Sequence, residues 1–314
     1  MKSSNIGGQA VLEGIMMRHK DVYSVAVRRP DGEIEVKTQP YKSLVKSEAL
    51  KRTPIVRGVF NFIESLVVGM KCLTYSASFF EEEEEGAREA PVLSQKEKEE
   101  AEQKKQKQDN MLMGMTVAIS IVLSVAIFIM LPYFIASFLR RVTDSESLIA
   151  IAEACVRLVI FLGYIALISR MKDIQRVFMY HGAEHKCINC VEHGLDLTVE
   201  NVMKSSREHK RCGTSFLLFV MIVSIIFFLF IRVSSPWLRV VVRLLLVPVI
   251  AGVSYEIIRL AGSSDNRFVN LLSKPGLALQ RLTTREPDES MVEVAIAAVE
   301  AVFDWKAYLR ENRP

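Results

Sequence analysis

The sequence predicts a mainly α-helical polytopic membrane protein, with about four transmembrane helices, an amphipathic helix and a small N-terminal β-hairpin element. The first observation behind this prediction is that half of the 314 residues are hydrophobic. The second is that these residues are clustered, because residues 111–139 and 213–231 contain no charged side chain. A helix needs roughly 20 apolar residues to cross the hydrocarbon core of a bilayer. Both segments are therefore predicted to span a membrane.

Residues 1–53 are predicted to form a soluble element with a β-hairpin. The segments "VYSVAV" and "EIEVKT" alternate apolar and polar residues, and the turn sequence "RRPDG" lies between them. Such alternation is typical of strands with one buried face. The glycine-rich "IGGQAVLEGIMMR" before them contains Glu13 and Arg18. These residues could support a functional site, with Arg18 binding a substrate anion, or the segment could be a tight turn packed on the membrane domain.

Residues 54–80 are predicted to form an amphipathic interfacial helix. Arg57, Glu64 and Lys71 are seven residues apart and therefore share one helix face, while most of the remaining residues are apolar. The same segment could instead insert as a fifth membrane segment. Residues 81–110 are dominated by charge and are predicted to be a charged linker, with an exposed helix containing Glu–Lys pairs as the alternative.

A four-span membrane domain is predicted over residues 111–262. Two weaker spans complete it, Ser147–Ser169 and Pro236–Gly262. These two spans carry the charged residues Glu153, Arg157, Arg239, Arg243, Glu256 and Arg259. A charge at the centre of a lone span costs about 2.5–3.5 kcal/mol on insertion scales. Paired charges facing a bundle interior cost less, so these two spans are predicted to face the inside of the bundle.

The distribution of basic residues predicts that both termini are cytoplasmic. Residues 91–110, 170–213 and 259–281 carry 17 lysines and arginines, whereas the loops on the other side carry 5. Basic residues accumulate in cytoplasmic loops. We therefore expect a multi-pass protein of the cell (inner) membrane, with loop 170–213 in the cytoplasm. The net charge of +4 is explained by this bias, and no nucleic-acid partner is expected.

The C-terminal segment 263–314 is predicted to be a cytoplasmic loop followed by a helix. Residues 263–274 are polar and loop-like. The stretch "MVEVAIAAVEAVFDWKAYL" has helical periodicity, and Asp288 or Ser290 can cap its start.

Loop 170–213 contains the strongest functional signal. The stretch "YHGAEHKCINCVEH" holds three of the five histidines and two of the five cysteines. His181, Glu184 and His185 form the pattern His-x-x-Glu-His on a predicted helix that ends at Gly194. Residues four apart lie on one helix face, so both histidines can bind one ion while Glu184 takes a proton from a water molecule. This is the inverted zincin motif. It predicts a metal site for Zn²⁺ or another divalent transition metal.

A catalytic zinc site needs a third protein ligand and an open position. Inverted zincins take a glutamate far downstream, and Glu256 lies in the fourth predicted span near its cytoplasmic end. Glu256 could instead form an ion pair with Arg259. Possible additional ligands in the same loop are Cys190, Cys212, His193 and His209. Cys187 and Cys190, with Cys212 and a histidine, could alternatively form a structural zinc site.

Six segments in order resemble the YqhQ-like family of bacterial membrane proteins. They are "GGQAVLEGIMMR", "AVRRPDGEI", "YHGAEHKCINCVEHG", "RCGTSFLLFVMIVSI", "AGVSYEIIRLAG" and "PGLALQRLTTREPDES". The resemblance covers nearly the whole chain and implies a domain of unknown function described as a predicted metal-dependent enzyme. Family members usually have threonine where this chain has Cys187, which favours Cys190 and Cys212 as the thiol ligands.

Two functional hypotheses follow from the sequence. The first is a zinc-dependent membrane enzyme of the hydrolase type, with Glu184 as general base and a membrane protein or lipid-linked molecule as substrate. The second is a non-enzymatic scaffold or biogenesis factor for the envelope or membrane proteins, with a structural metal. The sequence contains no glycine-rich phosphate loop, nucleophile elbow or dinucleotide fingerprint. A transporter is disfavoured because no inverted repeat is visible.

Overall fold

The computed structural model describes residues 3–86, 95–231, 233, 235–263 and 266–312. The chain divides into two compact units. The first comprises Met1–Glu81, Ile165–Ile226 and Leu245–Pro314, and the second comprises Glu82–Tyr164 and Phe227–Leu244. The first unit contains the sheet and the histidine-rich helix.

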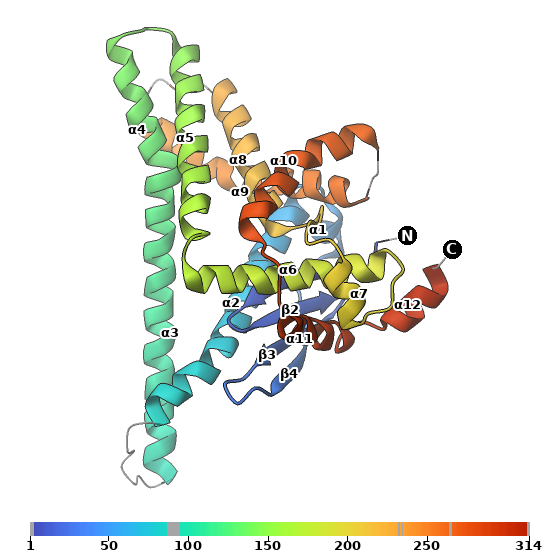
Figure 1. Ribbon diagram of the computed structural model, residues 1–314. Coiled ribbons are helices and arrows are strands. Elements are labelled where there is room, and N and C mark those ends of the chain that lie inside the picture. The colour runs from blue at the N-terminus through green and yellow to red at the C-terminus, as the bar shows by residue number, and fades with distance from the viewer. Residues whose placement is uncertain (1–2, 87–94, 232, 234, 264–265, 313–314) are drawn as a thin grey trace. The chain divides into compact units, whose positions relative to one another are not determined.

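An antiparallel sheet opens the first unit. Its strands β1 (Ile6–Val11), β2 (Gly14–His19), β3 (Val22–Arg28) and β4 (Ile34–Pro40) are ordered as they occur in the chain (Figure 1). The predicted hairpin is confirmed as β3 and β4, which pair from Val22↔Pro40 to Arg28↔Ile34. The glycine-rich segment before it forms the second hairpin, β1–β2.

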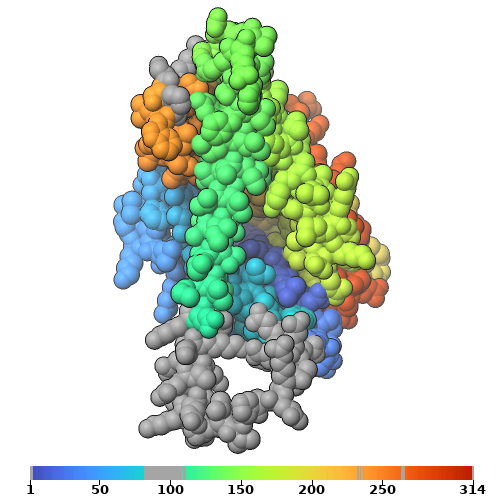
Figure 2. Space-filling view, turned by 90° about the vertical axis from the view of Figure 1, so that its left-hand side faces the viewer, coloured from blue at the N-terminus to red at the C-terminus, as the bar shows by residue number. Residues whose placement is uncertain are grey.

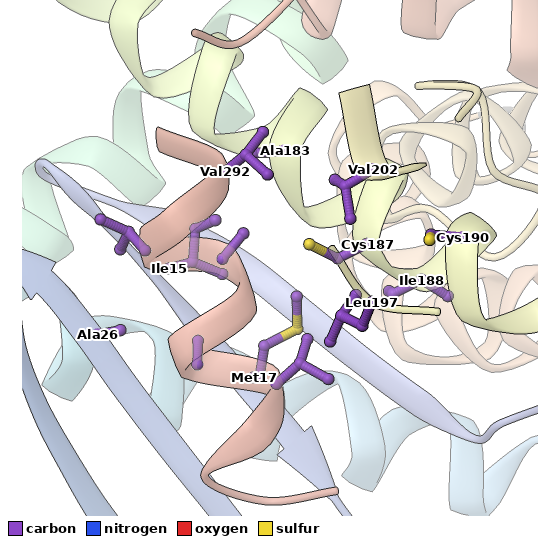
Figure 3. Packing of buried hydrophobic residues seen from close by; sticks show 14 of the residues in the cluster. Ile15, Met17, Ala26, Ala183, Cys187, Ile188, Cys190, Leu197, Val202 and Val292 are labelled. Atoms are coloured by element: carbon purple, nitrogen blue, oxygen red, sulfur yellow. The ribbon is translucent and has the colours of Figure 1, made fainter. Parts of the chain in front are cut away.

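Helices cover both faces of this sheet. One face packs against α6 (Lys172–Glu192) and α11 (Glu289–Glu300), and α7 (Val199–Lys204) packs on these two helices. Figure 3 shows Ile15 and Met17 of β2 in this cluster. The other face packs against α2 (Val56–Gly86), through Met16 of the same strand. This alternation follows from the two-residue period of a strand.

The helix predicted over residues 54–80 is present as α2, but its polar face is not the exposed one. Glu64 is buried and accepts hydrogen bonds of 2.7 Å from the Ser43 hydroxyl and the Leu44 amide, and a third from the Tyr41 hydroxyl. Arg57 binds the carboxylate of Glu256, and only Lys71 is exposed. The exposed face of α2 carries Ile63, Leu66, Val67, Met70 and Leu73. A buried carboxylate with three donors is satisfied inside the protein, so Glu64 can face inward.

Four helices in the described residues are long and apolar enough to cross a membrane. They occupy Met111–Arg141, Glu146–Ile168, Gly213–Phe230 and Trp237–Gly262. These segments belong to α3 (Gln95–Val125) with a π-helical turn at Ala126–Met130, α4 (Leu131–Ser137), a 3-10 turn at Phe138–Arg141, α5 (Glu146–Ile168), α8 (Gly213–Phe230) and α9 (Pro236–Ser263). Figure 2 shows residues 111–141 as a continuous green column of side chains. By length and composition, these helices confirm the prediction of a membrane protein with four spans. Helix α2 is not among the four.

Three charged residues within the spans of the second unit form one cluster. Glu153 is bound by Arg157 at 2.6 Å and by Arg243 at 2.7 Å. All three side chains are buried. One carboxylate of α5 therefore joins two guanidinium groups, one from its own helix and one from α9.

Two segments differ from the sequence prediction. The charged linker predicted over 81–110 is helical where it is described, because α2 extends to Gly86 and α3 begins at Gln95; residues 87–94 lie outside the described residues. The loop predicted over 263–274 is largely helical. Asn266 accepts a hydrogen bond from the Phe268 amide and caps α10 (Arg267–Thr283).

The C-terminal helix is present but is divided into two. Asp288 caps α11 as predicted, accepting a hydrogen bond of 2.9 Å from the Met291 amide. The chain then turns after Glu300 and continues as α12 (Trp305–Asn312). A short helix, α1 (Glu48–Arg52), precedes α2.

Candidate metal centre

The histidine motif lies on α6, which ends as predicted. The helix stops at Glu192, and Gly194 follows in the left-handed conformation with φ 83°. Ala183, Cys187 and Val191 face the sheet and join its core cluster. His181 and His185, four residues apart, face the chain segment before α8.

Three side chains converge beside α6. One ligand atom from each of His181, His185 and Cys212 lies within 4.8 Å of the others. The Cys212 sulfur is 3.2 Å from Nε2 of His181. His185 and Cys212 are 1% and 4% exposed. Among the described residues, this is the one group of at least three histidine, cysteine or acidic side chains that is close enough together to hold a metal ion.

Backbone carbonyls orient both imidazole rings. Nδ1 of His181 lies 2.9 Å from the Thr283 carbonyl oxygen, and Nδ1 of His185 lies 2.6 Å from that of Arg207. A carbonyl only accepts, so each Nδ1 carries the proton and donates it. Each Nε2 is then the nitrogen left to bind a metal, once it has released any proton, which is the arrangement usual for metal-binding histidines.

The electrostatics of the group favour a thiolate. Burial raises the pKa of the Cys212 thiol, but the neighbouring His181 and His185 outweigh it, and the pKa lies well below its usual value. Burial lowers the pKa of His181, whereas Cys212, Glu184 and the Thr283 carbonyl raise it to about 9. The thiolate is the form of cysteine that binds metals.

Glu184 lies next to this group, against β1. A Cβ atom added to Gly8 would lie 2.9 Å from the carboxyl carbon of Glu184 and 2.8 Å from the Met16 carbonyl oxygen. The side chain of Glu184 is buried, and Glu184 is not one of the three converging residues. The glycine at position 8 therefore gives Glu184 its place, which explains part of the glycine-rich "IGGQ" segment.

Two polar side chains of α6 hold the segment that supplies Cys212. The buried Lys186 ammonium donates to the carbonyl groups of Met203 and Ser205 at 2.8 and 3.0 Å. The Asn189 amide donates to those of Ser206 and Glu208 at 2.6 and 3.0 Å. The sequence did not predict a role for either residue, although both lie in the stretch "YHGAEHKCINCVEH".

The end of α10 and the segment after it complete the surroundings. A Cβ atom at Gly182 would lie 2.0 Å from the Arg285 carbonyl oxygen, so only glycine lets this segment cross α6. Buried Gln280 accepts from the His209 amide at 2.9 Å and donates to the His209 carbonyl at 2.8 Å. Neither Gln280 nor the Thr283 carbonyl could be predicted from sequence patterns, because each binds a residue about 70 to 100 positions away in the chain.

Glu256, the predicted distant ligand, does not lie in the group. Its carboxylate accepts a hydrogen bond of 2.7 Å from Nε of Arg57, and its contact with Arg259 is longer, at 3.9 Å. The third donor is Cys212 instead. The reason is that α2 packs against α9, which brings a guanidinium group to Glu256; a single sequence does not reveal that pairing.

The remaining cysteines of the loop do not converge on the histidines. Cys187 and Cys190 are residues of α6 whose side chains belong to its apolar core cluster (Figure 3). Burial raises the pKa of both thiols, to about 11 for Cys190. These two residues pack as small apolar side chains, so they do not form the alternative structural zinc site.

The other two predicted histidine ligands have different partners. His193 is exposed, and its Nδ1 lies 2.7 Å from the Asn189 carbonyl oxygen. The His209 ring centre is 5.7 Å from that of His185, but its Nε2 lies 3.6 Å from Glu192. Neither belongs to the converging group.

Glu13 and Arg18 also lie outside the group. Glu13 forms an ion pair with Arg176 in the first part of α6, with 2.5 Å between Nη2 and Oε2. The Arg18 guanidinium lies 3.3 Å from the ring centre of Tyr41, on the α2 side of the sheet. Glu13 thus fastens the β1–β2 turn to α6, and Arg18 packs on an aromatic ring.

Comparisons with known proteins agree with the resemblance seen in the sequence. The chain is 38% identical over 310 residues to a protein of Bacillus subtilis (strain 168) named "Uncharacterized protein YqhQ", covering 98% of this chain and 95% of that protein. No solved structure matches. The family described as "Protein of unknown function (DUF1385)" matches residues 53–305, a stretch that contains α6, Cys212 and Thr283. Neither this description nor the name of the Bacillus subtilis protein mentions a metal or a reaction. The chain belongs to this family.

Proposed function

We propose that this protein is a metal-dependent membrane enzyme of the hydrolase type, with Zn²⁺ or another divalent transition metal held by His181, His185 and Cys212. The observation that carries the proposal is the convergence of these three donors within 4.8 Å. It is supported by the two carbonyl groups that leave both Nε2 atoms free to bind an ion.

The donor set fits zinc. Imidazole and thiolate ligands suit this metal, and three protein ligands with an open position are typical of catalytic zinc sites. When bound, such a zinc ion polarises a substrate oxygen and makes a water molecule more acidic. The neighbouring His181 and His185 lower the pKa of Cys212, which favours the thiolate form that binds metals.

Glu184 is the proposed general base. Its side chain is buried, and Glu184 directly precedes His185 on α6, so we assign it the role of accepting a proton. The substrate is proposed to be a membrane protein segment or a lipid-linked molecule, because Cys212 directly precedes the candidate span Gly213–Phe230. We place the site on the cytoplasmic face of the bacterial inner membrane, from the bias of basic residues.

A structural metal is the second candidate. Its ligands come from α6 and from the segment before α8, and His181 is also tied to the end of α10. An ion at this position would clamp three parts of the chain together, as a scaffold or biogenesis factor could require. Coordination separates the two candidates, because a clamp has four protein ligands and an enzyme keeps one position open.

Metal analysis of the purified full-length protein tests the proposal. We expect about one zinc per chain by analogy with single catalytic sites, and loss of most of it in His181→Ala, His185→Ala and Cys212→Ser. Cys190→Ser is the matched control and should keep its metal, because Cys190 packs in the core cluster. Metal retention in a His181→Ala/His185→Ala double variant would refute the site.

A second measurement tests the reaction. Glu184→Gln keeps the shape of the side chain but cannot take up a proton, so the variant should bind metal and fail to complement the phenotype of a deletion strain. Full complementation by this variant would refute the hydrolase and leave the structural metal as the function of the site.

A further inference from the structure

Helix α10 buries three polar side chains and exposes most of its apolar ones, with Val269 and Leu279 as the buried exceptions. Ser273, Gln280 and Thr283 are 4%, 0% and 1% exposed. Phe268 and Leu271 are 71% and 61% exposed. The apolar residues Phe268, Leu271, Leu272, Pro275 and Leu282 recur at helical spacing and form one outer stripe. In water, a helix of a folded domain shows the reverse pattern.

Both ends of α10 are tied to membrane spans on the same side. Ser215, the third residue of the span Gly213–Phe230, accepts a hydrogen bond of 2.7 Å from Gln280 and fills the space left by the missing side chain of Gly276. At its other end, α10 begins five residues after the span Trp237–Gly262. Consecutive spans run in opposite directions, so the start of one and the end of the next lie at the same bilayer surface.

Basic residues line one edge of the outer stripe. Arg267, Lys274 and Arg281 are seven residues apart and all exposed. Seven residues are close to two turns, so the three side chains share one edge of the helix. Arg281 also contacts Glu208 at 3.0 Å, with 69% of its side chain exposed. An apolar stripe bordered by lysine and arginine is the pattern of helices that lie in the interface of an anionic bilayer.

We propose that α10 lies in the interfacial layer of the bilayer, with its apolar stripe among the acyl chains and its basic edge on acidic phospholipid headgroups. The proposal does not depend on a metal. It has one corollary that rests on the proposed function: Thr283 at the end of α10 orients His181, so the site would receive substrates that the membrane carries.

Tryptophan quenching by brominated lipids tests the position of α10. The full chain carries two tryptophans, Trp237 and Trp305. A Phe268→Trp variant with both replaced by phenylalanine reports on α10 alone. In vesicles of brominated phosphatidylcholine, the indole at position 268 should lose more than half of its fluorescence and resist aqueous iodide. The matched control is Trp237→Phe, in which Trp305 should respond to iodide and not to the brominated lipid.

The headgroup preference is tested with the same variant. Brominated phosphatidylglycerol should quench the indole at position 268 more than the same fraction of brominated phosphatidylcholine. Lys274→Gln and Arg267→Gln should each reduce this preference about fivefold, which corresponds to about 1 kcal/mol per basic residue. Iodide quenching without lipid quenching at position 268 would overturn the bilayer assignment. Equal quenching by both lipids would overturn the assignment of acidic headgroups. Neither measurement needs the metal, so this proposal and the proposed function can fail separately.

Discussion

Gly8 determines how closely β1 approaches Glu184. An added methyl group would meet the Met16 carbonyl at 2.8 Å as well as the Glu184 carboxyl at 2.9 Å, whereas nothing lies within 4 Å at Gly7. We predict that Gly8→Ala lowers the free energy of unfolding by about 1–3 kcal/mol, the usual cost of overpacking, and displaces Glu184. Gly7→Ala should change neither. Denaturation in detergent measures the effect, and equal stability of the two variants would contradict the close approach.

Glu192 supplies a second residue-scale prediction. Burial raises the pKa of its carboxyl, but His209, Arg211 and Ser4 lower it to about 2 from 4.5. Because the folded-state pKa lies below the unfolded value, the carboxylate stabilises the protein fully above pH 4.5 and loses this effect as the pH falls toward 2. The shift corresponds to about 3 kcal/mol at neutral pH.

We therefore predict that Glu192→Gln lowers the unfolding temperature at pH 7. The difference in unfolding temperature between this variant and the wild type should become smaller in acid. Thermal unfolding over a pH series measures this difference. Glu200→Gln is the matched control, because Glu200 pairs with Lys204 at the surface with 76% of its side chain exposed. A pH-independent difference for Glu192→Gln would contradict the charge-based explanation.

Among the elements, the helix pair α5 and α9 depends on one carboxylate. Glu153 is bound by Arg157 and Arg243, and all three are buried. Removing one partner of a buried ion pair typically costs about 3–5 kcal/mol, and we predict a loss of this size for Glu153→Gln. Glu146→Gln is the control, since its partner Arg140 is 39% exposed. Similar unfolding temperatures for both variants in detergent would argue against the buried cluster.

Elements that follow from local sequence patterns could be predicted, whereas features that depend on contacts between distant residues could not. Helix α6, its end at Gly194 and the four spans follow from local spacing and composition, and the sequence predicted them. The first part of α10 lies within residues 263–274, which the sequence predicted as a loop because they are polar and their apolar side chains face outward rather than into a core. Cys212 could be named only as one of several candidate ligands, since its approach to His181 depends on the hydrogen bonds of Lys186 and Asn189.

At the scale of the whole molecule, the basic residues predict that both termini and loop 170–213 are cytoplasmic. The 17 to 5 bias is large, and orientation in membranes follows such bias. A reporter that is active only in the cytoplasm should work when fused to either end of the chain. Activity at one end alone would require an odd number of spans and would contradict the four-span topology.

The central claim is that His181, His185 and Cys212 hold one metal ion, and X-ray absorption at the zinc edge tests it most directly. The account predicts two nitrogen ligands at about 2.0–2.1 Å, one sulfur at about 2.3 Å and one light ligand in the open position. In Cys212→Ser the sulfur contribution should vanish. A spectrum without sulfur in the wild type, or one with two or more sulfur ligands, would contradict the site.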